Sequence, residues 1–65
     1  MNYIVYGKKI GRQRQMCIRD SPDCGRAKMY ADKLAEMVPG FIFQVRGAGT
    51  RKVYYEKAGK PEESV

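Results

Sequence analysis

Apolar and polar residues alternate over residues 2–6, 41–46 and 51–57, and this alternation is typical of β-strands. The three segments are rich in aromatic and β-branched side chains, which favour the extended backbone. A shorter apolar run lies within residues 15–19, and we expect it to form a strand that pairs back on the first one. Residues 47–50 contain two glycines and predict a tight hairpin turn between the last two strands.

The segment from Ser21 to Val38 predicts the helix of this chain. Ser21 is expected to cap the helix, and Pro22 then stands at the first helical position, where its missing N–H is not needed. Pro39 and Gly40 end the helix. The apolar residues that recur at helical spacing are Ala27, Tyr30, Ala31, Leu34 and Val38.

The predicted order β(β)αββ is an α+β fold, with one helix packed across one face of a small antiparallel sheet. A chain of 65 residues allows one domain, which we expect over residues 1–57, followed by a flexible tail over residues 58–65. A domain of this size buries only about 60% of the surface of its unfolded chain. A homodimer joined through a sheet edge would add buried surface, and the small size of the core therefore favours such a dimer.

Charge and composition exclude several classes of protein. Thirteen Lys and Arg against seven Asp and Glu give a net charge of +6. The chain has no histidine, and its two cysteines, Cys17 and Cys24, are too few for a structural zinc site, so we expect neither metal nor cofactor. No apolar run is long enough for a membrane span, and no secretory signal is visible, which predicts a cytoplasmic protein.

The basic residues are the candidate binding residues. In the predicted hairpin, Arg46 and Arg51 flank the turn, and alternation places Tyr54 outward beside them, with Val53 and Tyr55 facing the core. An aromatic side chain among cations on an open sheet is a common way to bind single-stranded nucleic acid. The predicted binding surface consists of Lys8, Lys9, Arg46, Arg51, Lys52 and Tyr54.

The first strand and the residues after it, Tyr3-Ile4-Val5-Tyr6-Gly7-Lys8-Lys9-Ile10-Gly11, resemble the start of small uncharacterised proteins of phages and Gram-positive bacteria. A looser likeness extends to the helix and to residues 39–46. The resemblance implies an accessory protein of a phage or mobile element, and it brings no family chemistry with it.

Residues 14–21, Arg-Gln-Met-Cys-Ile-Arg-Asp-Ser, resemble the translated end sequence of the transposon used to prepare DNA sequencing libraries. On this interpretation, residues 12–21 replace a natural strand or loop, and the chain is a chimera. The alternative is an ordinary basic strand. Without residues 12–21 the remainder still carries +4, so the basic character does not depend on this segment.

Four functional hypotheses follow. The first is a non-enzymatic binding protein that blocks a host protein handling nucleic acid, as an anti-CRISPR inhibitor does. The second is direct binding of single-stranded DNA or RNA by the sheet. The third is a small ribonuclease toxin that uses Arg46, Arg51, Tyr54 and Tyr55 in place of histidine. The fourth is a generated or chimeric chain that folds without a natural function.

Overall fold

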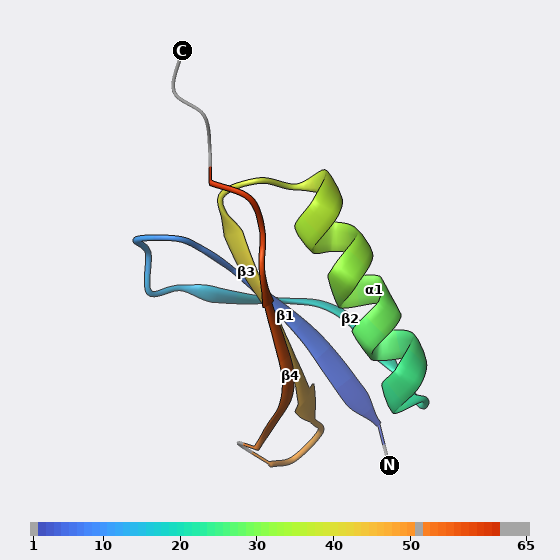
Figure 1. The fold of residues 1–65 in the computed structure, drawn as a ribbon. Coiled ribbons are helices and arrows are strands. Elements are labelled where there is room, and N and C mark those ends of the chain that lie inside the picture. The colour runs from blue at the N-terminus through green and yellow to red at the C-terminus, as the bar shows by residue number, and fades with distance from the viewer. Residues whose placement is uncertain (1, 51, 62–65) are drawn as a thin grey trace.

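The computed structural model describes residues 2–50 and 52–61 of the chain. It contains one helix and a four-stranded antiparallel sheet, which confirms the predicted α+β class and the order β(β)αββ (Figure 1). The elements are β1 (Tyr3–Lys9), β2 (Gln15–Ser21), α1 (Cys24–Met37), β3 (Phe41–Gly47) and β4 (Val53–Ala58).

The strands lie in the order β2-β1-β3-β4, so β1 and β3 form the centre of the sheet and β2 and β4 form its edges. The helix α1 crosses one side of the sheet (Figure 1). We call the opposite side the outer face; in the part of the chain that the structure describes, no helix covers it. Its central residues are Ile4, Tyr6 and Lys8 of β1 and Ile42, Gln44 and Arg46 of β3.

The core lies between α1 and the two central strands. Val5, Phe43 and Val45 are buried on the sheet, each at most 2% exposed. The helix meets them with three alanines one turn apart, Ala27, Ala31 and Ala35, whose small side chains let the helix lie close to the sheet. The predicted stripe members Tyr30, Leu34 and Val38 flank this line and are partly buried. Within the described residues, β2 supplies no side chain to the core.

Two boundaries differ from the prediction. The first strand does not end at Tyr6; it continues to Lys9, because β3 pairs with it along its whole length, from Tyr3 opposite Gly47 to Lys9 opposite Phe41. The helix begins later than predicted. Ser21 is the last residue of β2, and Asp23 is the N-cap, whose carboxylate accepts a hydrogen bond of 2.9 Å from the backbone N–H of Gly25.

Each edge strand contains a bulge. In β2, Arg19 pairs with Val5 and Cys17 with Tyr6, so Ile18 is the extra residue. In β4, Tyr55 pairs with Val45 and Val53 with Arg46, so Tyr54 is the extra residue. Such irregularities disfavour the addition of another strand to an edge. The predicted homodimer through a sheet edge stays a prediction.

The ordered body of the fold extends beyond the predicted boundary at residue 57. Ala58 belongs to β4, and the backbone N–H of Gly59 donates a 2.7 Å hydrogen bond to the carbonyl of Phe41. The N–H of Gly40 donates a 2.8 Å hydrogen bond to the carbonyl of Lys60. Of the predicted flexible tail, residues 62–65 lie outside the described residues. No helix among the described residues is long and apolar enough to cross a membrane.

Candidate nucleic-acid interface

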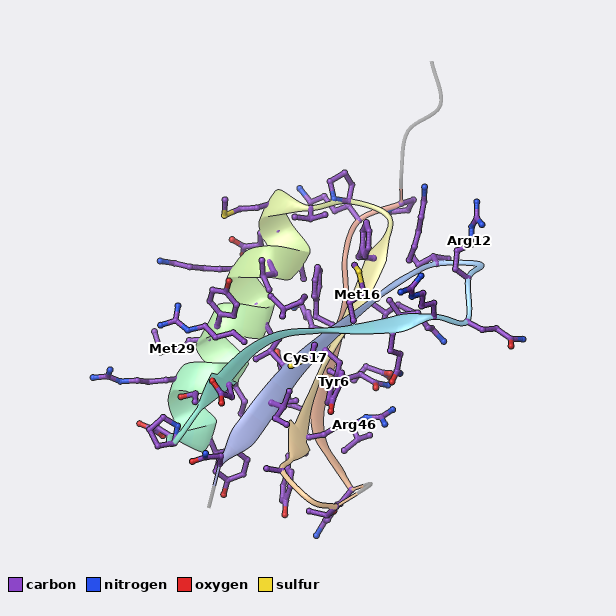
Figure 2. The ribbon with its side chains drawn as sticks, turned by 180° about the vertical axis from the view of Figure 1, so that it is seen from behind. Tyr6, Arg12, Met16, Cys17, Met29 and Arg46 are labelled. Carbon is purple, nitrogen blue, oxygen red and sulfur yellow. The ribbon has the colours of Figure 1, made fainter. Side chains whose placement is uncertain are left out.

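The hairpin that joins β1 to β2 carries a concentration of positive charge. From Lys8 to Gln15 the chain contains four cationic side chains and no acidic one, and we call this segment the basic arm. Figures 1 and 2 show that the tip of the arm projects away from α1. Gly11 makes the turn with φ of 87°, and the N–H of Arg12 donates a 2.9 Å hydrogen bond to the carbonyl of Lys9. The cations of the arm are Lys8, Lys9, Arg12 and Arg14.

On the same sheet, Arg46 and Tyr6 form a stacked pair on the outer face (Figure 2). The guanidinium carbon of Arg46 lies 5.5 Å from the centre of the Tyr6 ring, within the range of a cation–π contact. Alternation along β1 and β3 places both side chains on the same face, because Tyr6 pairs with Gln44 and Ile4 pairs with Arg46. The pair therefore combines an aromatic ring and a permanent positive charge in one position of the open sheet.

Gln44 holds the guanidinium of Arg46 in place. Its side-chain oxygen accepts hydrogen bonds from Nε and Nη2 of Arg46, at 3.1 and 2.8 Å, and a longer one of 3.3 Å from Gln15. Its amide nitrogen donates to the carboxylate of Glu56 at 2.6 Å. These contacts run from β2 to β4 across the outer face. They use Nε and Nη2 of Arg46, and no described residue accepts a hydrogen bond from Nη1.

The structure divides the predicted binding residues between two ends of the sheet. Lys8 pairs with Ile42 and Lys9 with Phe41, at the end where the basic arm begins. Arg46 lies four residues from Ile42 along β3, about 13 Å away at strand spacing. Lys52 follows the turn beyond Arg46, and Arg51 lies outside the described residues. Lys8 and Arg46 share the outer face, whereas the five predicted residues that the structure describes do not form one compact patch.

Tyr54 does not lie where alternation predicts it. The bulge in β4 brings Val53 opposite Arg46, so Val53 lies on the outer face, where it is 41% exposed. Tyr54 turns the other way, and its ring packs edge-to-face against Tyr3, with ring centres 5.4 Å apart. The ammonium group of Lys52 lies 5.3 Å from the centre of the Tyr54 ring. Tyr54 is therefore separated from Arg46, and the prediction that the two share a face is wrong.

Sequence analysis missed three residues of the outer face, namely Tyr6, Gln15 and Gln44. Alternation indicated that Gln44 and Arg46 share a face, but it did not indicate which strand of the sheet lies beside them. That requires the strand order, in which β1 separates β2 from β3. Arg12 and Arg14 were also left out, although the spacing of charges along residues 8–15 was a visible signal.

Of the residues in the ribonuclease hypothesis, Arg51 lies outside the described residues, and Arg46, Tyr54 and Tyr55 do not form one cluster. Tyr55 packs toward the core and donates a hydrogen bond to the carboxylate of Asp32 on α1, while Tyr54 contacts Tyr3. The hydrogen bond to Asp32, together with desolvation and the charge of that carboxylate, raises the pKa of Tyr55 above its ordinary value of 10.0. Among the described residues, no group of three or more Cys, Asp or Glu side chains is placed to hold a metal ion.

Comparison with protein-family models, with curated proteins and with solved structures finds no match for this chain.

Proposed function

We propose that this protein is a non-enzymatic module that binds single-stranded nucleic acid through its basic arm and the adjoining outer face. The observation that carries the proposal is the position of the arm. Four cations without an intervening carboxylate lie on one hairpin, and Lys8 of that hairpin shares the outer face with Tyr6 and Arg46. A phosphate backbone would contact the arm, and a base would stack beside Tyr6.

The outer face suits a nucleic acid better than it suits a tight protein interface. Protein inhibitors rely on a few buried aromatic or aliphatic anchors at the centre of the contact. The centre of this face is instead a polar network in which Gln44 contacts Arg46, Gln15 and Glu56. Amide and guanidinium groups are suited to base edges and phosphates. Blocking of a nucleic-acid-handling host protein, as a phage inhibitor would do, was the first hypothesis from the sequence and is the second one here.

The test is the salt dependence of binding to a fluorescently labelled single-stranded oligonucleotide, followed by anisotropy. If the four cations of the arm all contact phosphates, the logarithm of the association constant should fall with log salt at a slope of about −3. A variant in which Lys8, Lys9, Arg12 and Arg14 are replaced by Gln should lose most of this slope. Both DNA and RNA oligonucleotides should be measured, because the open sheet alone does not distinguish them.

A matched variant removes the same charge elsewhere, with Lys28, Lys33, Lys57 and Lys60 replaced by Gln. If the basic arm is the binding surface, this variant should keep the affinity within a few-fold of the unmodified protein. Equal losses in the two variants would mean that the nucleic acid responds to net charge alone, and the proposal would be wrong. Recovery of a defined host protein from nuclease-treated lysate, lost in the arm variant, would favour the inhibitor hypothesis instead.

A further inference from the structure

A second open surface lies on the helix-facing side of the sheet, between β2 and the first half of α1. It is a groove of about 490 Å³. Its floor is formed by Val5 of β1 and Ala27 of α1, which are each 1% exposed. On one side, the guanidinium of Arg19 lies over the ring of Tyr30, 5.2 Å from its centre. The groove lies on the side of the sheet opposite the outer face.

The groove exists because one helix is too narrow to cover this sheet. Four strands spaced about 4.8 Å apart are roughly 19 Å wide, whereas a helix with its side chains is about 10 Å wide. The helix α1 packs mainly on β3 and least on β2. The helix-facing side chains of β2 are consequently exposed, with Met16 at 52% and Ile18 at 38%. The uncovered strip has about the width of a second helix.

Three of the five charged residues that line the groove are positively charged. They are Arg19, Arg26 and Lys33. Asp20 and Asp23 also line the groove, so its charged side chains have an excess of one positive charge. Asp20 pairs with Ile4 and therefore points to the outer face, and the carboxylate of Asp23 accepts the capping hydrogen bond from Gly25. The groove thus combines an apolar floor with a cationic rim.

The helix flank of the groove carries an exposed methionine. Met29 lines the groove and is 68% exposed, a large fraction for an apolar side chain. Methionine is flexible and polarisable, and it is common on surfaces that accept helices of varied sequence. Met29 and the β2 residues Met16 and Ile18 would be covered together by one helix lying beside α1.

We infer that this groove binds an amphipathic helix of a partner protein, whose apolar stripe lies on the floor and whose acidic side chains face Arg19, Arg26 and Lys33. The bound helix would complete the helical layer, packing beside α1 at the usual 8–10 Å between axes. Because the groove and the outer face are on opposite sides of the sheet, both surfaces can be occupied at once. The inference does not depend on the proposed nucleic-acid function. It depends on the residues present, whatever the origin of residues 14–21.

The probe is a synthetic peptide of about 16 residues, with leucines at helical spacing and glutamates on the remaining positions. The control peptide keeps the leucines and replaces each glutamate with lysine. Binding is measured by fluorescence anisotropy, and the contact surface is mapped by amide chemical shifts. We expect the acidic peptide to bind and to shift the amides of Arg19, Met29, Tyr30 and Lys33, and the lysine peptide to bind at least about tenfold more weakly.

Two charge-reversal variants locate the contact. Arg26→Glu with Lys33→Glu should weaken binding of the acidic peptide about tenfold or more, since both side chains are exposed at the groove. Lys28→Glu with Lys57→Glu makes the same change of charge away from the groove and should weaken it by no more than about threefold. A Met29→Ser variant, which keeps the charge, should also weaken binding, because the apolar contact is lost.

Four results would overturn the inference. They are equal losses in the two charge-reversal variants, peptide shifts confined to the outer face, displacement of the peptide by a single-stranded oligonucleotide, and concentration-dependent shifts at Met29 without peptide. The third would make nucleic acid the occupant of the groove, and the fourth would make it a second copy of this chain. If the basic arm does not bind an oligonucleotide, the expected binding of the acidic peptide to the groove is unchanged. The two proposals can therefore be disproved independently.

Discussion

The phenol of Tyr55 on β4 donates a hydrogen bond to the carboxylate of Asp32 on α1, and so a polar contact joins the helix to an edge strand. The bond requires the proton on Tyr55, which explains why the pKa of Tyr55 is raised in the folded protein. The contact stabilises the position of β4, whose apolar contribution to the core is limited to the partly buried Tyr55.

This contact predicts a loss of stability in alkaline solution. Because the folded-state pKa of Tyr55 is above the unfolded value of about 10, the folded state binds the proton more tightly. The resulting stability is fully present below pH 10 and is lost as the pH rises through the folded-state pKa. Thermal unfolding between about pH 8 and 11.5 should show this decline, and Tyr55→Phe should show less of it. An unchanged pH profile in Tyr55→Phe would contradict the prediction.

Because Asp23 is the N-cap of α1, alanine at Asp23 should lower the free energy of unfolding more than alanine at Ser21 does. Asp23→Ala removes the acceptor for the N–H of Gly25 and should lower the free energy of unfolding by about 1 kcal/mol. Ser21→Ala should cost less, because the Ser21 hydroxyl makes longer contacts of 3.2 Å at the exposed end of β2. Urea unfolding of the two variants measures both free energies. A larger loss of stability in Ser21→Ala would show that Ser21, and not Asp23, is the main N-cap.

The close packing around Gly7 predicts that Gly7→Ala destabilises the fold, by an amount that depends on the side chain of Ile18. A Cβ at position 7 would lie 2.6 Å from Cδ1 of Ile18 and 3.1 Å from the ring of Phe43, so Gly7→Ala should destabilise by about 1–3 kcal/mol. Ile18→Val removes the closest atom. In that background the cost of Gly7→Ala should fall clearly, which a double-mutant cycle of urea unfolding measures. Additive losses would show that Phe43 alone causes the crowding.

The core predicts that substitutions on β2 lower the free energy of unfolding much less than substitutions on β3 do. Met16→Thr changes a side chain that is 52% exposed and should alter the free energy of unfolding by no more than about 0.5 kcal/mol. Val45→Ala truncates a fully buried side chain and should cost about 2 kcal/mol or more. Similar losses at the two sites would mean that β2 is part of the core after all.

The contacts of Arg46 on the outer face predict that oligonucleotide affinity depends on the planar shape of its guanidinium group as well as on its charge. Arg46→Lys keeps the charge but loses the planar group that Gln44 orients over Tyr6, so oligonucleotide affinity should fall several-fold with the salt slope unchanged. Arg46→Ala should also make the slope shallower by about 0.7, the contribution of one phosphate contact. Anisotropy titrations over a range of salt concentrations separate the two effects. Full affinity in Arg46→Lys would exclude a positioning role for Gln44.

Local patterns were sufficient to predict the element types and the fold class. Alternation identified β1 and β3, and the spacing of Ala27, Tyr30, Ala31 and Leu34 identified α1. Such patterns act within a few residues, so they do not reveal a bulge, which shifts the alternation by one position. That is why Tyr54 and Val53 were assigned to the wrong faces. The same limit applies to Gln15 and Gln44, which lie 29 positions apart and meet only through the order of the strands.

The chain can be divided by what each segment contributes to folding. The buried side chains of Val5, Phe43, Val45 and the three helical alanines lie outside residues 12–21, and β2 is held chiefly by its backbone pairing with β1. Amide hydrogens of β2 should therefore exchange with solvent through partial opening, at a smaller free energy than those of β1 and β3. Each such opening exposes the edge of β1 and its Tyr-Ile-Val-Tyr run, a segment able to pair with another chain. The lifetime of the β1–β2 pairing, more than the size of the core, would then set how long this protein survives at high concentration before it aggregates.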